Sequence, residues 1–93
     1  MEENQVREVF DTGLSKIRHE IKSRLVPHGL YGSVIQVDIE SADRSPTGSN
    51  IELIVKDRHV HRAFDREQIE NCCLRVRGEV LLGIISMIEE VSA

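Results

Sequence analysis

The sequence predicts a two-layer α+β domain of order αβββα, with two amphipathic helices packed on one face of a small antiparallel three-stranded meander. Two observations predict the helices and one predicts the sheet. Apolar residues recur every three or four positions near both ends of the chain, and they alternate with polar residues in between. The chain has 93 residues and only three aromatic ones, which predicts a single domain with an aliphatic core.

The first helix is expected over residues 3–25. Acidic residues precede basic ones along it, which suits the helix dipole, and Pro27 is expected to end it. Gly13, inside the helix, indicates either a weak point or close packing against the second helix. The apolar face of this helix comprises Val6, Phe10, Leu14, Ile17, Ile21 and Leu25.

Between the helices, period-two alternation predicts three strands, at residues 34–40, 51–57 and 59–64. Residues 41–50 collect Ser, Asp, Pro, Thr, Gly and Asn, and this composition predicts a flexible hairpin loop. A tight turn is expected at Asp57–Arg58. Arg62 shares the inner face of the third strand with Val60 and Phe64, which requires a sheet edge where its charge can reach water.

The last element is expected to be one continuous helix over residues 65–91. Asp65 and Gln68 form the pattern of a capping box at its start. A break near Gly78 followed by a strand over residues 80–88 is the competing interpretation, because glycine weakens a helix interior. An i,i+4 pair between Arg75 and Glu79 favours the continuous helix.

This helix is more apolar than one covered face requires. Its main face is expected to enter the core and comprises Ile69, Cys72, Cys73, Val76, Val80, Ile84, Met87 and Val91. A second stripe beside it comprises Leu74, Leu81, Ile85 and Ile88. The second stripe predicts an interface with a protein partner, either a second copy in a homodimer or another chain. In the alternative, the first helix covers this stripe within one chain.

Nucleic-acid binding is a further hypothesis, based on the basic segments 16–24 and 56–66. Within the second segment, the candidate contacts are Lys56, Arg58, Arg62 and Arg66. The net charge of −4 and the scarcity of aromatic residues disfavour it. The element order resembles that of the double-stranded RNA-binding domain, a family with a lysine-rich start to its last helix. Residues 65–70 read Asp-Arg-Glu-Gln-Ile-Glu at that place, so none of the family's contact residues carries over.

Metal binding is a third hypothesis, since His59 and His61 project from the same face of one strand. Further ligands are suggested only by nearness in sequence, at His28, Asp57 and Asp65. No zinc-ligand spacing accompanies them, and two solvated histidines explain the pattern as well. Neither a metal nor another cofactor is expected.

No catalytic motif is present either: the sequence has no nucleophile elbow and no phosphate loop leading into a helix. We therefore expect a non-enzymatic protein without a small-molecule substrate. The N-terminus lacks the pattern of a signal peptide, and the longest apolar run, residues 80–88, is far short of the roughly 20 residues of a membrane span. Adjacent Cys72 and Cys73 suit reduced core thiols. These features predict a soluble cytoplasmic protein.

Overall fold

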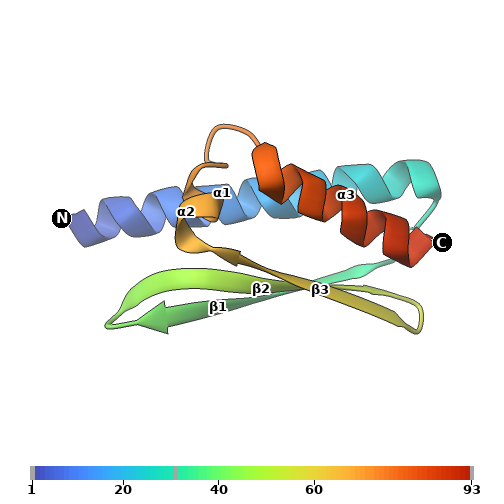
Figure 1. The fold of residues 1–93 in the computed structure, drawn as a ribbon, viewed down its shortest axis with the longest axis horizontal. Helices are drawn as coiled ribbons and strands as arrows, with labels where there is room; N and C mark the ends of the chain where they lie inside the picture. The colour runs from blue at the N-terminus through green and yellow to red at the C-terminus, as the bar shows by residue number, and fades with distance from the viewer. Residues whose placement is uncertain (1, 31, 93) are drawn as a thin grey trace.

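The computed structural model describes residues 2–30 and 32–92, with side chains from residue 7 onward. Three helices lie on one face of an antiparallel sheet with strand order β1-β2-β3, which confirms the predicted α+β class (Figure 1). The elements are α1 (Glu2–Leu25), the 3₁₀ turn η1 (Val26–His28), β1 (Val34–Ala42), β2 (Ser45–Val55), β3 (Arg58–Asp65), α2 (Arg66–Glu70) and α3 (Gly78–Ser92).

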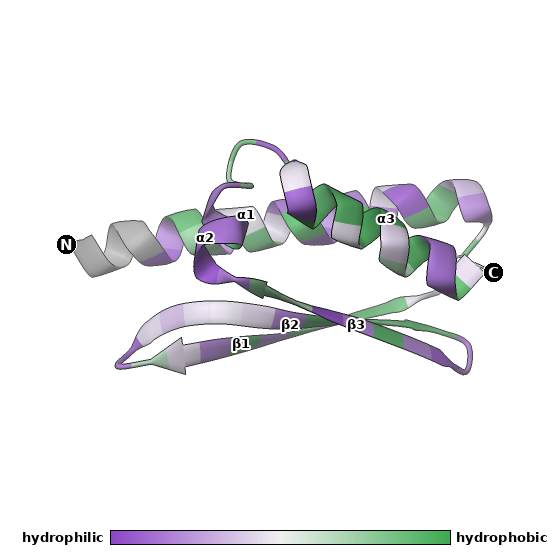
Figure 2. Cartoon of the chain, viewed as in Figure 1, coloured by the Kyte–Doolittle hydropathy of each residue, from purple (hydrophilic) through white to green (hydrophobic). Residues whose placement is uncertain are grey.

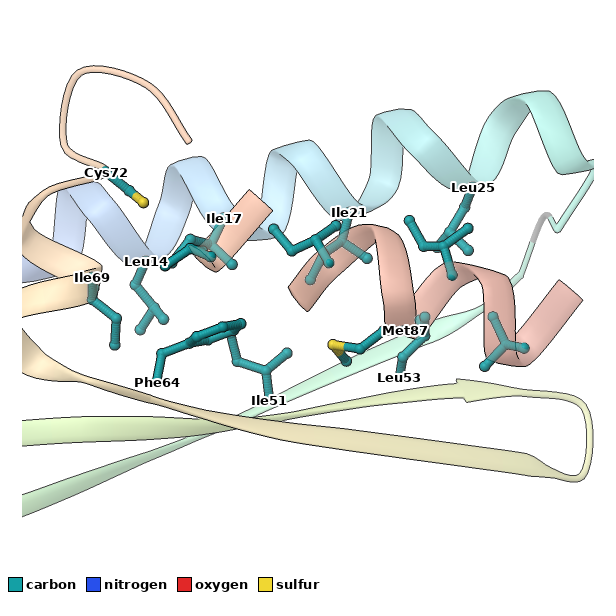
Figure 3. Packing of buried hydrophobic residues seen from close by; sticks show 14 of the residues in the cluster. Leu14, Ile17, Ile21, Leu25, Ile51, Leu53, Phe64, Ile69, Cys72 and Met87 are labelled. Atoms are coloured by element: carbon teal, nitrogen blue, oxygen red, sulfur yellow. The ribbon is translucent and has the colours of Figure 1, made fainter. Parts of the chain in front are cut away.

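The core lies between the helical layer and β2 (Figure 3). The predicted apolar face of α1 is buried from Phe10 to Leu25, and Val6 belongs to the residues whose side chains are not described. Each fully buried aliphatic or aromatic side chain contributes about 1.5–3 kcal/mol. The other buried apolar residues are Ile51, Leu53, Val55, Phe64, Ile69, Cys72, Val80, Ile84, Met87, Ile88 and Val91.

The predicted flexible loop at residues 41–50 is wrong. β1 and β2 continue through this stretch and meet at a two-residue turn, Asp43–Arg44, where both residues have positive φ (50° and 67°). Two successive positive φ angles define a type I′ turn, whose twist matches that of paired strands. Two non-glycine residues occupy this turn, so the composition of the stretch did not reveal it.

The turn-forming residues of this stretch have specific places in β2. Pro46 lies where the β1–β2 register shifts, between Glu40 and Ser41. Gly48 lies so close to β3 that a Cβ atom on it would be 2.6 Å from the Phe64 carbonyl oxygen. The buried hydroxyl of Ser49 donates a hydrogen bond to the Asp38 carbonyl oxygen at 2.9 Å. Proline, glycine and serine here therefore serve a strand and not a loop.

The β2–β3 connection falls one residue earlier than expected. The turn is Lys56–Asp57, with Lys56 at a φ of 58°, and β3 begins at Arg58. The inner faces agree with the prediction, because Ile51, Leu53 and Val55 are all buried.

The continuous helix predicted over residues 65–91 is also wrong. It is divided into α2 and α3 by a connector at residues 71–77. Gly78 has a φ of +64°, whereas an α-helix requires about −63°. The competing interpretation placed the break correctly near Gly78, but the strand that it predicted beyond the break is the helix α3.

The start of α2 agrees with the prediction. Asp65 and Gln68 form a complete capping box. The backbone N–H of Gln68 donates to Asp65 Oδ1 at 2.8 Å, and the backbone N–H of Asp65 donates to Gln68 Oε1 at 3.0 Å. Gln68 Nε2 also donates to Glu79 Oε2 at 3.1 Å, which links α2 to the start of α3.

Gly13 is the point of close packing between α1 and α2. A Cβ atom on Gly13 would overlap the carbonyl oxygen of Ile69, and Ile69 itself is fully buried. The close-packing interpretation of Gly13 is therefore confirmed, with α2 as the helix that it contacts.

Candidate interaction surface

Among the described α-helix residues, Leu82 on the outward side of α3 is the most exposed large apolar side chain. Figure 2 shows hydrophobic residues along most of α3. Val80, Ile84, Met87 and Val91 enter the core, whereas Leu82 is 67% exposed. Leu81 and Ile85 are half-buried. Leu82 and Leu81 lie three and four residues before Ile85, so the three side chains are neighbours on the helix surface. We call Leu81, Leu82 and Ile85 the α3 patch.

The structure separates the four residues of the predicted stripe. Leu81 and Ile85 lie together in the α3 patch, whereas Ile88 is 4% exposed and belongs to the core. Leu74 is 86% exposed but lies in the connector, outside any helix. Ile88 is therefore covered within the chain itself, and only Leu81 and Ile85 of the stripe remain in a common exposed surface.

A shallow groove of about 300 Å³ adjoins the α3 patch. It lies between the end of α1 with the turn after it and the C-terminal half of α3. Ile85 and Ile88 form its apolar side, and Arg24 and Glu89 add charge at its rim. Arg24 is already paired with Glu20 at 2.8 Å. An apolar centre with a polar rim is the usual composition of a protein-binding site.

Sequence reasoning missed Leu82, which is the most exposed residue of the α3 patch. The two apolar faces derived from the sequence did not include Leu82. On a helical wheel Leu82 lies nearly opposite the core residues Val80 and Ile84, wherever the helix begins. The spacing of two residues from Val80 and from Ile84 was thus the available signal.

The β3 edge of the sheet is protected by α3, which packs against it, and by the charged side chain of Arg62. Arg62 lies on the inner face and runs beneath α3 toward Ser86, with Nη2 3.5 Å from Ser86 Oγ. Gly83 makes room for it, since a Cβ atom there would be 2.7 Å from Arg62 Cδ. The expectation that Arg62 needs a sheet edge and extends outward is confirmed.

The predicted basic residues do not form one cluster. Arg58 is the first residue of β3, and Arg66 lies just beyond its other end. An eight-residue strand separates the two residues by about 25 Å. Arg58 Nη1 donates to the Glu90 carbonyl oxygen at 3.2 Å, and Arg66 Nε pairs with Glu70 at 3.2 Å. Lys56 lies in the exposed β2–β3 turn. Nucleic-acid binding stays a prediction, with three of its four residues engaged within the chain.

Part of the basic segment 16–24 faces the other edge of the sheet. Arg18 and Lys22 line a groove between α1 and β1, and β1 is the edge strand opposite β3. Arg18 and Lys22 therefore lie beside the β1 edge and Arg62 beside the β3 edge. Arg24, at the end of α1, instead lines the groove against α3.

His59 and His61 lie on the open face of the sheet, the face turned away from the helices. Both are exposed, and His59 Nδ1 is 3.6 Å from Glu52 Oε2 on β2. Within the part of the chain that the structure describes, no three His, Cys, Asp or Glu side chains are grouped to hold a metal ion. His28, Asp57 and Asp65 do not join the two histidines in such a group.

The two cysteines differ in their surroundings. Cys72 is 1% exposed within the core, whereas Cys73 is half-buried in the connector, and both are free thiols. The predicted core position is therefore confirmed for Cys72 only.

Comparisons with protein-family models, with curated proteins and with solved structures found no match for this chain. In the described residues, no helix has both the length and the apolar character that crossing a membrane requires.

Proposed function

We propose that this chain is a small non-catalytic interaction module that binds a protein partner through the α3 patch. The observation behind the proposal is the exposure of Leu82 at 67%, beside half-buried Leu81 and Ile85 and an apolar groove. A leucine or phenylalanine side chain of the partner fits the groove beside Ile85. Its binding there is favourable mainly because apolar surface is removed from water. The two free thiols suit a reducing compartment, and we propose the cytoplasm.

The test is affinity purification from cells with the tagged wild-type chain, Leu82→Glu and a control, Val9→Glu. Val9 is an apolar residue of α1 that is 39% exposed and lies outside the α3 patch. The expected result is a partner protein that copurifies with wild type and Val9→Glu and is depleted at least tenfold (about 1.4 kcal/mol) with Leu82→Glu. Equal recovery with all three chains would contradict the proposal.

Folding of the variants is measured alongside. Leu82 is an exposed residue, and its substitution is expected to leave the melting temperature within a few degrees of wild type. A loss of binding with unchanged melting therefore assigns the effect to the surface and not to stability.

A further inference from the structure

The outer edge of β1 has no neighbouring strand within the part of the chain that the structure describes. None of the nine residues of β1 is buried. From Val34 to Glu40 the strand pairs regularly with β2, and the register shifts only after Glu40. Along these seven regular residues, alternate residues direct their backbone N–H and C=O groups to the open edge.

The inner face of β1 is incompletely covered. Val37 and Ile35 are half-buried, although the residues paired with them on β2, Ile51 and Leu53, are fully buried. Ile39, further along the same face, is 38% exposed. A groove of about 580 Å³ between α1 and β1 borders Val37 and Ile39. The apolar side chains on the inner face of β1 are thus only partly removed from water.

The two sheet edges differ in how they are protected against pairing. Natural edge strands are protected by inward-pointing charges, edge lysine or proline, bulges, or a covering helix. β3 has inward-facing Arg62, and α3 packs over it. β1 contains neither lysine nor proline, and alternation places Asp38 and Glu40 on the open face. The edge suited to accept another strand is therefore β1.

We propose that β1 is a self-association edge, at which a second copy pairs antiparallel about a twofold axis at Val37 to form a six-stranded sheet. This register uses the whole regular stretch and places Ile35 opposite Ile39 of the second copy. On the open face, Gln36 is opposite Asp38 and Val34 is opposite Glu40. An axis at Asp38 instead opposes two like charges and includes the register shift after Glu40.

The charges of α1 also suit a second copy in this orientation. α1 and β1 run in opposite directions (Figure 1), so an antiparallel β1 pair makes the two α1 helices antiparallel as well. Glu8 and Asp11 are exposed in the first half of α1, where Asp11 already pairs with Arg7 at 3.1 Å. Lys16, Arg18 and Lys22 are exposed in the second half, so the first half is the more acidic and the second the more basic. Antiparallel helices bring the acidic half of one copy alongside the basic half of the other. This complementarity selects a second copy as the occupant of the edge.

The proposal goes beyond the α3 patch and does not depend on it. All helices lie on one face of the sheet, so the dimer would present two α3 patches on the same side of the assembly.

The register is tested with charge variants at the twofold axis. Wild type is expected to sediment as a dimer at micromolar concentration. Val37→Lys and Val37→Glu each place two like charges at closest approach, which raises the dimer dissociation constant at least tenfold. An equimolar mixture of the two variants restores the dimer, because Lys then faces Glu. The matched control, Gln36→Lys, faces Asp38 of the second copy and retains the dimer.

A wild type that stays monomeric up to about 100 μM overturns the proposal. So does a dimer that Val37→Lys leaves intact, or a failure of the two variants to complement each other. A dimer lost in Leu82→Glu but kept in Val37→Lys also overturns it and moves self-association to the α3 patch. Loss of partner binding in Leu82→Glu with the dimer intact supports both proposals separately.

A cysteine variant decides the question if the charged variants fail to fold. Residues directly opposite across antiparallel strands have Cα atoms about 4.5–5.5 Å apart, within the range of a disulfide. In a Cys73→Ser background, Val37→Cys is expected to form a covalent dimer under mild oxidation. In a dimer of Gln36→Cys, the two cysteines are offset by two residues along the paired strands, so no covalent dimer is expected. Equal cross-linking by both, or by neither, overturns the register.

Discussion

Gly13 has no side chain because the backbone of α2 occupies the space. Its substitution by alanine would raise helix propensity by about 1 kcal/mol. The added Cβ atom, however, overlaps the Ile69 carbonyl oxygen, and a backbone atom held by a buried residue cannot move aside. Overpacking of this kind costs about 1–3 kcal/mol or more. We expect Gly13→Ala to lower the free energy of unfolding by about 2 kcal/mol net, as measured by urea denaturation.

The control for Gly13→Ala is Thr12→Ala. Thr12 is exposed on the same helix, and alanine there is expected to stabilise the protein by a few tenths of a kcal/mol through propensity alone. If Gly13→Ala stabilised the protein as Thr12→Ala does, close packing of α1 on α2 would be disproved.

The turn between β1 and β2 contains an avoidable strain at Arg44. Its φ of 67° is left-handed, which costs a residue with a side chain about 1 kcal/mol. Glycine adopts this conformation freely and is the preferred second residue of a type I′ turn. Arg44→Gly is therefore expected to raise the free energy of unfolding by about 0.5–1 kcal/mol. Arg44→Ala keeps the strain and serves as the control, and an equal gain in both variants would attribute the effect to lost charge.

At the scale of elements, α3 is fitted to β3 through Gly83 and Arg62. The obstacle to a side chain at Gly83 is mainly the flexible Arg62 side chain, with Cδ 2.7 Å from the position of a Cβ atom. Gly83→Ala is expected to be more destabilising in wild type than in an Arg62→Ala background, by about 0.5–1 kcal/mol. A double-mutant cycle by chemical denaturation measures this coupling. A coupling energy of zero would show that Arg62 does not occupy this space in solution.

The sequence was most informative where a single local rule decided the structure. The three- and four-residue spacing from Phe10 to Leu25 predicted the buried face of α1, and the Asp65–Gln68 pattern predicted the cap of α2. Residues 41–50 failed because tertiary contacts determine their state. Gly48 is a strand residue only because β3 passes against it, and no local pattern contains that contact.

The candidate surface was predicted in part, and the error has a geometric origin. Leu81 and Ile85 belong to the exposed face, but the seven-residue connector between α2 and α3 removes Leu74 from the helix. Ile88 was assigned outward, although it lies against the end of α1 and is buried, and exposed Leu82 was overlooked. Cys72 lies in this connector and is nevertheless buried in the core.

At the scale of the whole molecule, the domain is elongated, and in the described part of the chain only one edge of its sheet, the β3 edge, is protected by a helix. Its extents are 44 × 23 × 20 Å, and its helices bury the inner residues of β2, whereas no residue of β1 is buried. A chain of 93 residues buries a smaller fraction of its surface than a larger domain does. Much of the stability that remains to be gained thus lies at the open outer edge of β1, where apolar residues of the inner face are only half-buried. Pairing at β1 would supply it.

This arrangement predicts that thermal stability depends on concentration. When the folded dimer dissociates on unfolding, a tenfold rise in chain concentration stabilises each chain by about 0.7 kcal/mol, which is about 3–5 °C in melting temperature for a domain of this size. Differential scanning fluorimetry from about 2 to 200 μM is expected to show this slope for wild type and Gln36→Lys. Val37→Lys is expected to show a smaller slope, because its weakened dimer is less populated over this concentration range. A flat wild-type line would mean that the exposed inner face of β1 is tolerated in the monomer, and that the open edge serves no copy of this chain.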